Sequence, residues 1–184
     1  MKRIPFVVGL VLLIFAVSLW AQTTAPKPDP EFKKFDVFLG HWTYEGENKA
    51  GPFGPASKVT GEETGKRILG DFFIQFQISI KGAMGESRSI EIVGYDPANK
   101  AFPSNEYYDD GTTASGAYAF NGNTFTYKGK FIVGGKPYIV KTTMIFTADS
   151  MSFAVKGEIS TDGKAWAPLF EGQFTKVKPA PKAK

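Results

Sequence analysis

Residues 72–80 alternate between two sets of side chains. The stretch reads FFIQFQISI. Successive side chains of a β-strand point to opposite faces, so a period of two predicts an extended segment with one buried face. The predicted buried set is Phe72, Ile74, Phe76, Ile78 and Ile80, and the opposite set is Phe73, Gln75, Gln77 and Ser79.

Similar alternation predicts further strands over 87–95, 123–133, 136–147, 150–159 and 168–177. Turn sequences separate them. Asp96-Pro97 favours a type I turn, whereas Asn121-Gly122 and Asp162-Gly163 permit the positive backbone angles of tight hairpins. Neighbouring strands are therefore expected to pair antiparallel. In all, the pattern indicates about ten strands and one short helical turn over 29–39.

This pattern predicts an all-β domain, either a sandwich or a single antiparallel up-and-down barrel. The chain contains 17 phenylalanines among 184 residues. A closed barrel of about ten strands has a wide interior that must hold large side chains or a ligand, so the phenylalanine content favours the barrel. Glycines inside the strands, such as Gly129 and Gly172, are interpreted as bends or bulges that help strongly curved strands to close.

The two ends of the chain predict export. Lys2 and Arg3 precede an apolar run that reaches Ala21, as in a secretory signal peptide, and an uncleaved membrane anchor is the alternative. The expected divisions are a signal peptide over 1–21, a Pro-rich linker over 22–31, a barrel domain over 32–177 and a basic disordered tail over 178–184. The destination is periplasmic or secreted, and membrane contact is expected only through an uncleaved N-terminal segment.

Composition and charge exclude several classes of protein. The chain has no cysteine, so the domain is not a disulfide scaffold. The net charge is +4, and residues 1–21 contribute two of these positive charges, so the domain is nearly neutral. Without a basic patch in the domain, we expect no nucleic-acid partner. The oligomeric state is left open.

Candidate catalytic chemistry is sparse. His41 is the single histidine, and a zinc site requires three or four ligands. The adjacent acidic pairs Glu62-Glu63 and Asp109-Asp110 would point to opposite faces of a strand, so neither pair is expected to serve one substrate. We therefore expect no metal, no cofactor and no enzymatic activity; an enzyme that depends on His41 is the third alternative for the function.

Three short stretches carry a family resemblance: FLGHW at 38–42, VGYDPANKAF at 93–102 and YYDDGT at 107–112. With the predicted run of hairpins, they resemble the bacterial domain-of-unknown-function family 1579, whose members are similar to lipocalin-type (calycin-like) and nitrobindin-like barrels. The resemblance covers about 32–177. It implies that Gly40 and Trp42 form the barrel-floor motif at the start of the first strand. Nitrobindin-like relatives bind haem through a histidine in a later strand, and this chain has no histidine after His41.

The interior of such a barrel is the candidate ligand site. We predict that a small hydrophobic molecule binds or is carried there. The alternative is a solid barrel that acts as a non-catalytic envelope interaction or scaffold protein, and the sequence leaves open whether the barrel is hollow. The expected ligand-binding residues, at the interior or the mouth, are Trp42, Phe72, Phe76, Tyr118, Phe125, Tyr127, Tyr138, Phe146 and Phe153.

Overall fold

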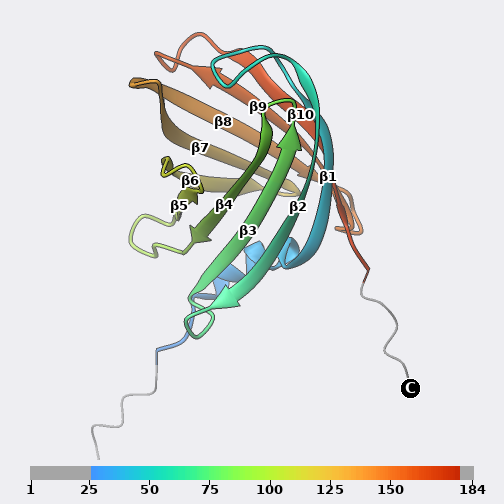
Figure 1. Cartoon of the computed structure of the whole chain (residues 1–184). Helices are drawn as coiled ribbons and strands as arrows, with labels where there is room; N and C mark the ends of the chain where they lie inside the picture. Colours follow the sequence, from blue (N-terminus) through green and yellow to red (C-terminus); the bar gives the residue numbers. More distant parts are fainter. Residues whose placement is uncertain (1–25, 179–184) are drawn as a thin grey trace, which may run out of the picture.

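The computed structural model describes residues 26–178, which form a closed barrel of ten antiparallel strands (Figure 1). Each strand pairs with its neighbours in sequence, and β1 closes the barrel by pairing with β10. The prediction of an all-β, up-and-down barrel with one short N-terminal helical element is confirmed. The elements are η1 (Pro30–Phe38), β1 (Gly40–Asn48), β2 (Ser57–Ile68), β3 (Phe73–Gly82), β4 (Gly85–Val93), β5 (Phe102–Tyr108), β6 (Thr113–Asn121), β7 (Thr124–Val133), β8 (Lys136–Phe146), β9 (Ser152–Ser160) and β10 (Ala167–Lys176).

The predicted signal peptide lies outside the described residues, as does all of the predicted basic tail except Lys178. The predicted export and cleavage stay predictions. The regular structure begins with η1 at Pro30, inside the predicted linker. Within residues 26–178, no helix is long and apolar enough to cross a membrane.

The 3₁₀-helix η1 covers one end of the barrel, which we call the floor (Figure 1). Asp29 caps it, because its side chain accepts a hydrogen bond from the Glu31 backbone N–H at 2.8 Å. A 3₁₀-helix has three residues per turn, so side chains three positions apart share one face. Phe32, Phe35 and Phe38 have this spacing, and all three are buried against the interior. The phenylalanine spacing thus fits the helix type.

The first strand begins at the floor with the predicted Gly-x-Trp pair. Gly40 has a φ of 110°, a conformation that favours glycine, and it turns the chain from η1 into β1. Trp42 is fully buried, and its indole Nε1–H donates a hydrogen bond to the Phe38 carbonyl at 3.0 Å. The ring packs against Phe146 and Phe153. Trp42 therefore ties the helix to the barrel wall.

Replacing Trp42 by Phe is expected to lower the free energy of unfolding by about 1–3 kcal/mol, because the Phe38 carbonyl loses its indole donor and a void forms. Urea unfolding followed by circular dichroism measures this loss. Trp166→Phe is the matched control, since Trp166 is half-buried in the β9–β10 loop at the opposite end. Equal stability losses in the two variants would contradict the structural role of the indole group.

Glycines in the strands make room for aromatic rings. A Cβ at Gly129 would lie 2.0 Å from the Tyr127 hydroxyl oxygen, and a Cβ at Gly172 would lie 2.5 Å from the Tyr44 ring. Both glycines keep the regular register with their neighbouring strands, so a bulge at either position is wrong, and the predicted bends stay a prediction. The rings lie against the wall above the glycines, which leaves space in the centre of the barrel.

Candidate functional site

A deep cavity of about 240 Å³ lies above the floor, inside the barrel. Phe35 and Phe38 from η1 line its base, and strand side chains surround it. Its wall includes Phe76, Ile78, Met144, Phe153, Val155 and Phe174. The barrel is therefore hollow, which decides a question that the sequence left open.

A second cavity of about 560 Å³ adjoins the first at the opposite end of the barrel, which we call the mouth. Glu91, Tyr118 and Met144 line both cavities, so the two spaces meet at these side chains. The loops at 49–56, 83–84 and 109–112 join strands at the mouth, and they contribute Phe53, Met84 and Asp110 to the lining. The arrangement gives a deep, largely apolar chamber below a more polar entrance.

Three acidic side chains stand on one side of the interior, and we call Glu63, Glu91 and Glu106 the carboxyl wall. They come from β2, β4 and β5 respectively. Glu63 lines the deep cavity, Glu106 the mouth cavity and Glu91 both. Glu91 and Glu106 are directly opposite each other across the β4–β5 pair, an arrangement that is unfavourable when both are charged.

Hydroxyl groups support two members of the carboxyl wall. Tyr118 donates to the two carboxylate oxygens of Glu91 at 2.8 and 3.1 Å, and Ser104 donates to the same carboxylate. Ser89 donates to Glu106 at 2.6 Å. These contacts fix the orientation of both carboxyl groups inside the barrel.

Burial shifts the protonation of the carboxyl wall. Desolvation raises the pKa of Glu63 to about 8, and the charges of Glu91 and Glu106 add to the rise. Desolvation also raises the pKa values of Glu91 and Glu106, although hydrogen bonds from their hydroxyl partners oppose the rise. At neutral pH Glu63 therefore holds a proton that an ordinary surface glutamate would have lost.

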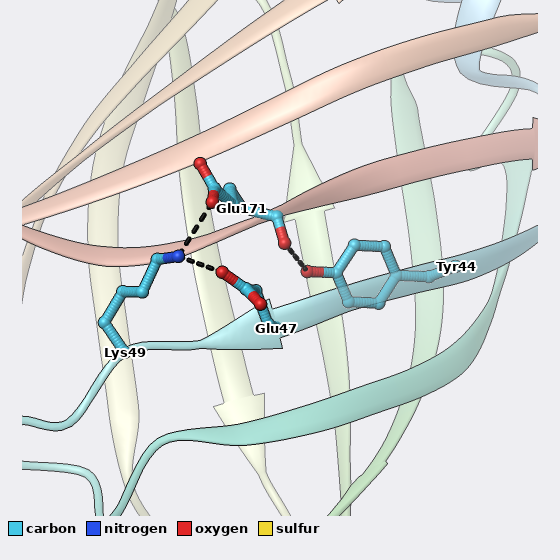
Figure 2. A network of polar contacts seen from close by, with 4 residues as sticks. All are labelled: Tyr44, Glu47, Lys49 and Glu171. Atoms are coloured by element: carbon cyan, nitrogen blue, oxygen red, sulfur yellow. Dashed lines mark hydrogen bonds and ion pairs between the residues drawn. The ribbon is translucent and has the colours of Figure 1, made fainter.

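The basic side chain at the mouth is already paired. Lys49 donates to Glu171 Oε1 at 2.7 Å and also contacts Glu47, and both carboxylates lie at the rim (Figure 2). Tyr44 extends the same network, because its hydroxyl donates to the Glu171 carbonyl at 3.4 Å. This rim network ties β1 to β10, and it engages the Lys49 charge away from the carboxyl wall.

The side chains expected to bind ligand occupy four kinds of position. Phe76, Tyr118 and Phe153 line the deep cavity, and Tyr118 and Tyr127 line the mouth cavity. Trp42, Phe125 and Phe146 pack in the aromatic core around the floor. Tyr138 packs on a smaller cluster formed by Val140, Ile159 and Leu169. Phe72 lies half-buried in the turn before β3, and it lines neither cavity.

His41 lies on the outer face of β1, away from both cavities. Its Nδ1 is 3.1 Å from the Thr64 hydroxyl, and its Nε2 is 4.0 Å from a Glu62 carboxylate oxygen. Glu62 is exposed, whereas its neighbour Glu63 faces inward, as alternation on a strand requires. Across residues 26–178, no group of three His, Cys, Asp or Glu side chains is arranged to hold a metal ion.

The sequence pattern does not predict the carboxyl wall. It places Glu63 and Glu62 on opposite faces of one strand, and Glu91 and Glu106 belong to two other strands. A signal was present: Glu91 falls between Ile90 and Ile92 in a strand whose buried set also contains Ser89 and Val93. Glutamate on the buried face of a strand is unusual, and it is a signal for a candidate functional site.

Comparisons with known proteins agree with this architecture. The model of the family described as "Protein of unknown function (DUF1579)" matches residues 27–176. The crystal structure of Rv2717c from M. tuberculosis superposes with a TM-score of 0.60 at 12% identity, covering 83% of this chain and 100% of that chain. The S-type phycobiliprotein lyase CPES from Guillardia theta gives a TM-score of 0.52 at 10% identity, covering 82% and 93%. The search of curated proteins found no match. At these identities the structural likenesses show the fold alone.

Proposed function

We propose that this chain, which belongs to the DUF1579 family of proteins of unknown function, binds one small and largely apolar molecule inside its barrel. The observation that carries the proposal is the deep cavity of about 240 Å³, which meets a wider cavity at the mouth. Ligand sites are typically concave, mostly apolar, largely preformed and equipped with a few convergent polar groups. The two cavities have these properties.

The way the interior is built also supports binding. Strand glycines take up the rings of Tyr44 and Tyr127 along the wall, so large side chains surround the space without filling it. An apolar molecule bound there would add packing contacts with the side chains that line the cavity, and so would stabilise the folded protein. The space inside the barrel argues against the solid-barrel alternative.

The proposal is for binding or transport of the ligand in an exported protein, without catalysis. His41, on which an enzymatic function would depend, contacts Thr64 and Glu62 on the outer surface rather than the cavities. The polar groups inside are carboxyls and hydroxyls, and they suit recognition of a ligand. Export depends on residues 1–21 and is tested by the N-terminal sequence and the cell fraction of the purified protein.

Filling the deep cavity should abolish binding. Val155 lines this cavity from β9, so Val155→Trp is expected to reduce the affinity for the neutral probe N-phenyl-1-naphthylamine at least about tenfold by occupying its space. Fluorescence titration of the probe measures the affinity. Ala154→Trp is the matched control, because Ala154 is exposed on the outer face of the same strand.

The control should bind the probe with wild-type affinity. Native mass spectrometry of the protein as purified, compared with the denatured sample, would in addition reveal a natural ligand as lost mass. Absence of probe binding by the wild-type protein would refute the proposed function. Equal losses from Val155→Trp and Ala154→Trp would place the binding outside the deep cavity.

A further inference from the structure

We infer that the molecule bound in the barrel is an organic cation, with an ammonium group directed at Glu63 and an apolar body among the phenylalanine rings of the deep cavity. This inference rests on the proposed function, because it specifies the chemical class of ligand for the same cavity. Three features carry it: an unpartnered carboxyl group, a surrounding set of aromatic rings, and a deep-cavity lining to which residues 26–178 contribute no lysine or arginine.

Glu63 is the unpartnered member of the carboxyl wall. No hydrogen bond or ion pair formed within residues 26–178 reaches it, whereas hydroxyl groups donate to Glu91 and Glu106. Its cross-strand neighbours are Trp42 on β1 and Ile78 on β3, so the adjacent strands supply no donor. Glu63 is half-buried, and its carboxyl group is accessible from the deep cavity. A carboxyl group that faces a ligand-sized cavity and has no partner is available to a positive group of a ligand.

The rings around the cavity suit the same ligand. Phe35, Phe38, Phe76, Phe153 and Phe174 line the deep cavity together with Glu63. The face of an aromatic ring carries partial negative charge and attracts a cation, and aromatic cages are a recurrent way to bind quaternary ammonium groups. The rings and the carboxyl group therefore both favour a positively charged ligand, and both disfavour an anion.

Basic side chains of the described barrel do not neutralise the carboxyl wall. No lysine or arginine from residues 26–178 lines the deep cavity. At the floor, the Arg67 side chain donates a hydrogen bond to the Asp36 carboxylate, and Lys176 donates one to the Val37 carbonyl at 3.4 Å. At the mouth, Lys49 pairs with two rim carboxylates. A cationic ligand would supply the positive charge that the interior lacks.

Binding of a cation should be coupled to proton release. The titratable groups that face the deep cavity and its entrance are Tyr44, Glu63, Glu91, Glu106, Tyr108, Tyr118 and Tyr127, with Lys49 and Asp110 at the mouth. Burial raises the pKa of Glu63 to about 8, so an ammonium group enters in exchange for a proton near neutral pH. The affinity for a permanently charged ligand should therefore rise between about pH 6 and about pH 9.

A pair of isosteric probes tests the inference. Benzyltrimethylammonium carries a fixed positive charge, and neopentylbenzene has the same shape with carbon in place of the nitrogen. At about pH 8.5, the cation is expected to displace N-phenyl-1-naphthylamine from the wild-type protein with at least about tenfold higher affinity than its neutral isostere. Glu63→Gln should remove this advantage, so that the variant binds the two isosteres with affinities within about twofold of each other. Glu62→Gln, on the outer face of the same strand, should change neither affinity.

The possible outcomes distinguish a failure of this inference from a failure of the proposed function. Equal affinities for the two isosteres, or tighter binding of neopentylbenzene that weakens as the pH rises, would overturn the cation and leave a neutral-ligand barrel. Displacement by neither isostere, together with no binding of N-phenyl-1-naphthylamine, would refute the proposed function itself. Calorimetry of benzyltrimethylammonium binding in two buffers of different ionisation enthalpy counts released protons in the wild-type protein. Binding without proton release near pH 7 would also overturn the inference.

Discussion

Raising the pH from about 5 to about 8.5 is expected to destabilise the protein by on the order of 3 kcal/mol, because Glu63 must lose its proton in the folded state. The folded-state pKa of Glu63 is raised from 4.5 to about 8 by burial and by the nearby charges of Glu91 and Glu106. In the unfolded chain the same group is already deprotonated above about pH 5. In most small proteins the free energy of unfolding rises over this pH range or stays constant.

The sign follows from proton binding. Between the two pKa values of Glu63, the folded protein holds a proton that the unfolded protein has released, so the free energy of unfolding falls as the pH rises. The raised pKa values of Glu91 and Glu106 act in the same direction. Below about pH 4 the trend should reverse, because surface carboxylates such as Asp162 have lowered pKa values and stabilise the fold only when charged. Maximum stability is therefore expected near pH 5.

Urea unfolding at about pH 5, 7 and 8.5 measures this dependence. Glu63→Gln should flatten the profile and make the variant more stable than the wild-type protein at about pH 8.5, since it removes a buried charge while keeping the side-chain shape. Glu62→Gln is the control, and it should keep the wild-type slope because Glu62 is exposed. A wild-type stability that is constant or increases over this pH range would show that Glu63 is solvated in the folded protein.

The strand pattern predicted the architecture because a barrel depends on alternation that is local in sequence. The run at 72–80 lies largely in β3, the helical turn over 29–39 contains η1, and the family resemblance based on FLGHW is confirmed. Barrel closure was favoured by composition, yet the pairing of β1 with β10 joins segments from opposite ends of the domain. Such long-range contacts leave no local signal.

The candidate site was less predictable, because it depends on which side chains meet across several strands. Glu63, Glu91 and Glu106 come from three separate strands, and single-sequence reasoning does not bring them together. The phenylalanines were expected to surround a ligand, but many of them fill the floor: Phe125 and Phe146 pack around Phe38. The division between floor and cavity depends on where η1 inserts, which the alternation of the strands does not encode.

Replacing Phe38 by Ala is expected to lower the free energy of unfolding by about 3–5 kcal/mol, because it removes the ring at the centre of the floor. Phe38 is 4% exposed. Its ring meets those of Phe125, Phe146 and Phe153 edge-on, with centroid distances of 4.9, 4.9 and 5.6 Å. Edge-to-face pairs add to the free energy gained from burial, so the loss should exceed that of an ordinary apolar residue. Urea unfolding at about pH 5, where Glu63 is protonated, measures the loss of the Phe38 ring without a contribution from the deprotonation of Glu63.

Lys33→Ala is the control for Phe38→Ala, since Lys33 is exposed on the same helix and its loss should change stability by less than about 0.5 kcal/mol. The variant pair also tests what η1 does for the cavity. If η1 is the floor of the ligand site, Phe38→Ala should enlarge the deep cavity and shift probe selectivity toward bulkier apolar molecules, provided that the protein remains folded. A stability loss as small as that of Lys33→Ala would mean that η1 is not seated in the barrel. In that case the lower end of the chamber would be open, and the interior would resemble a channel rather than a closed binding site.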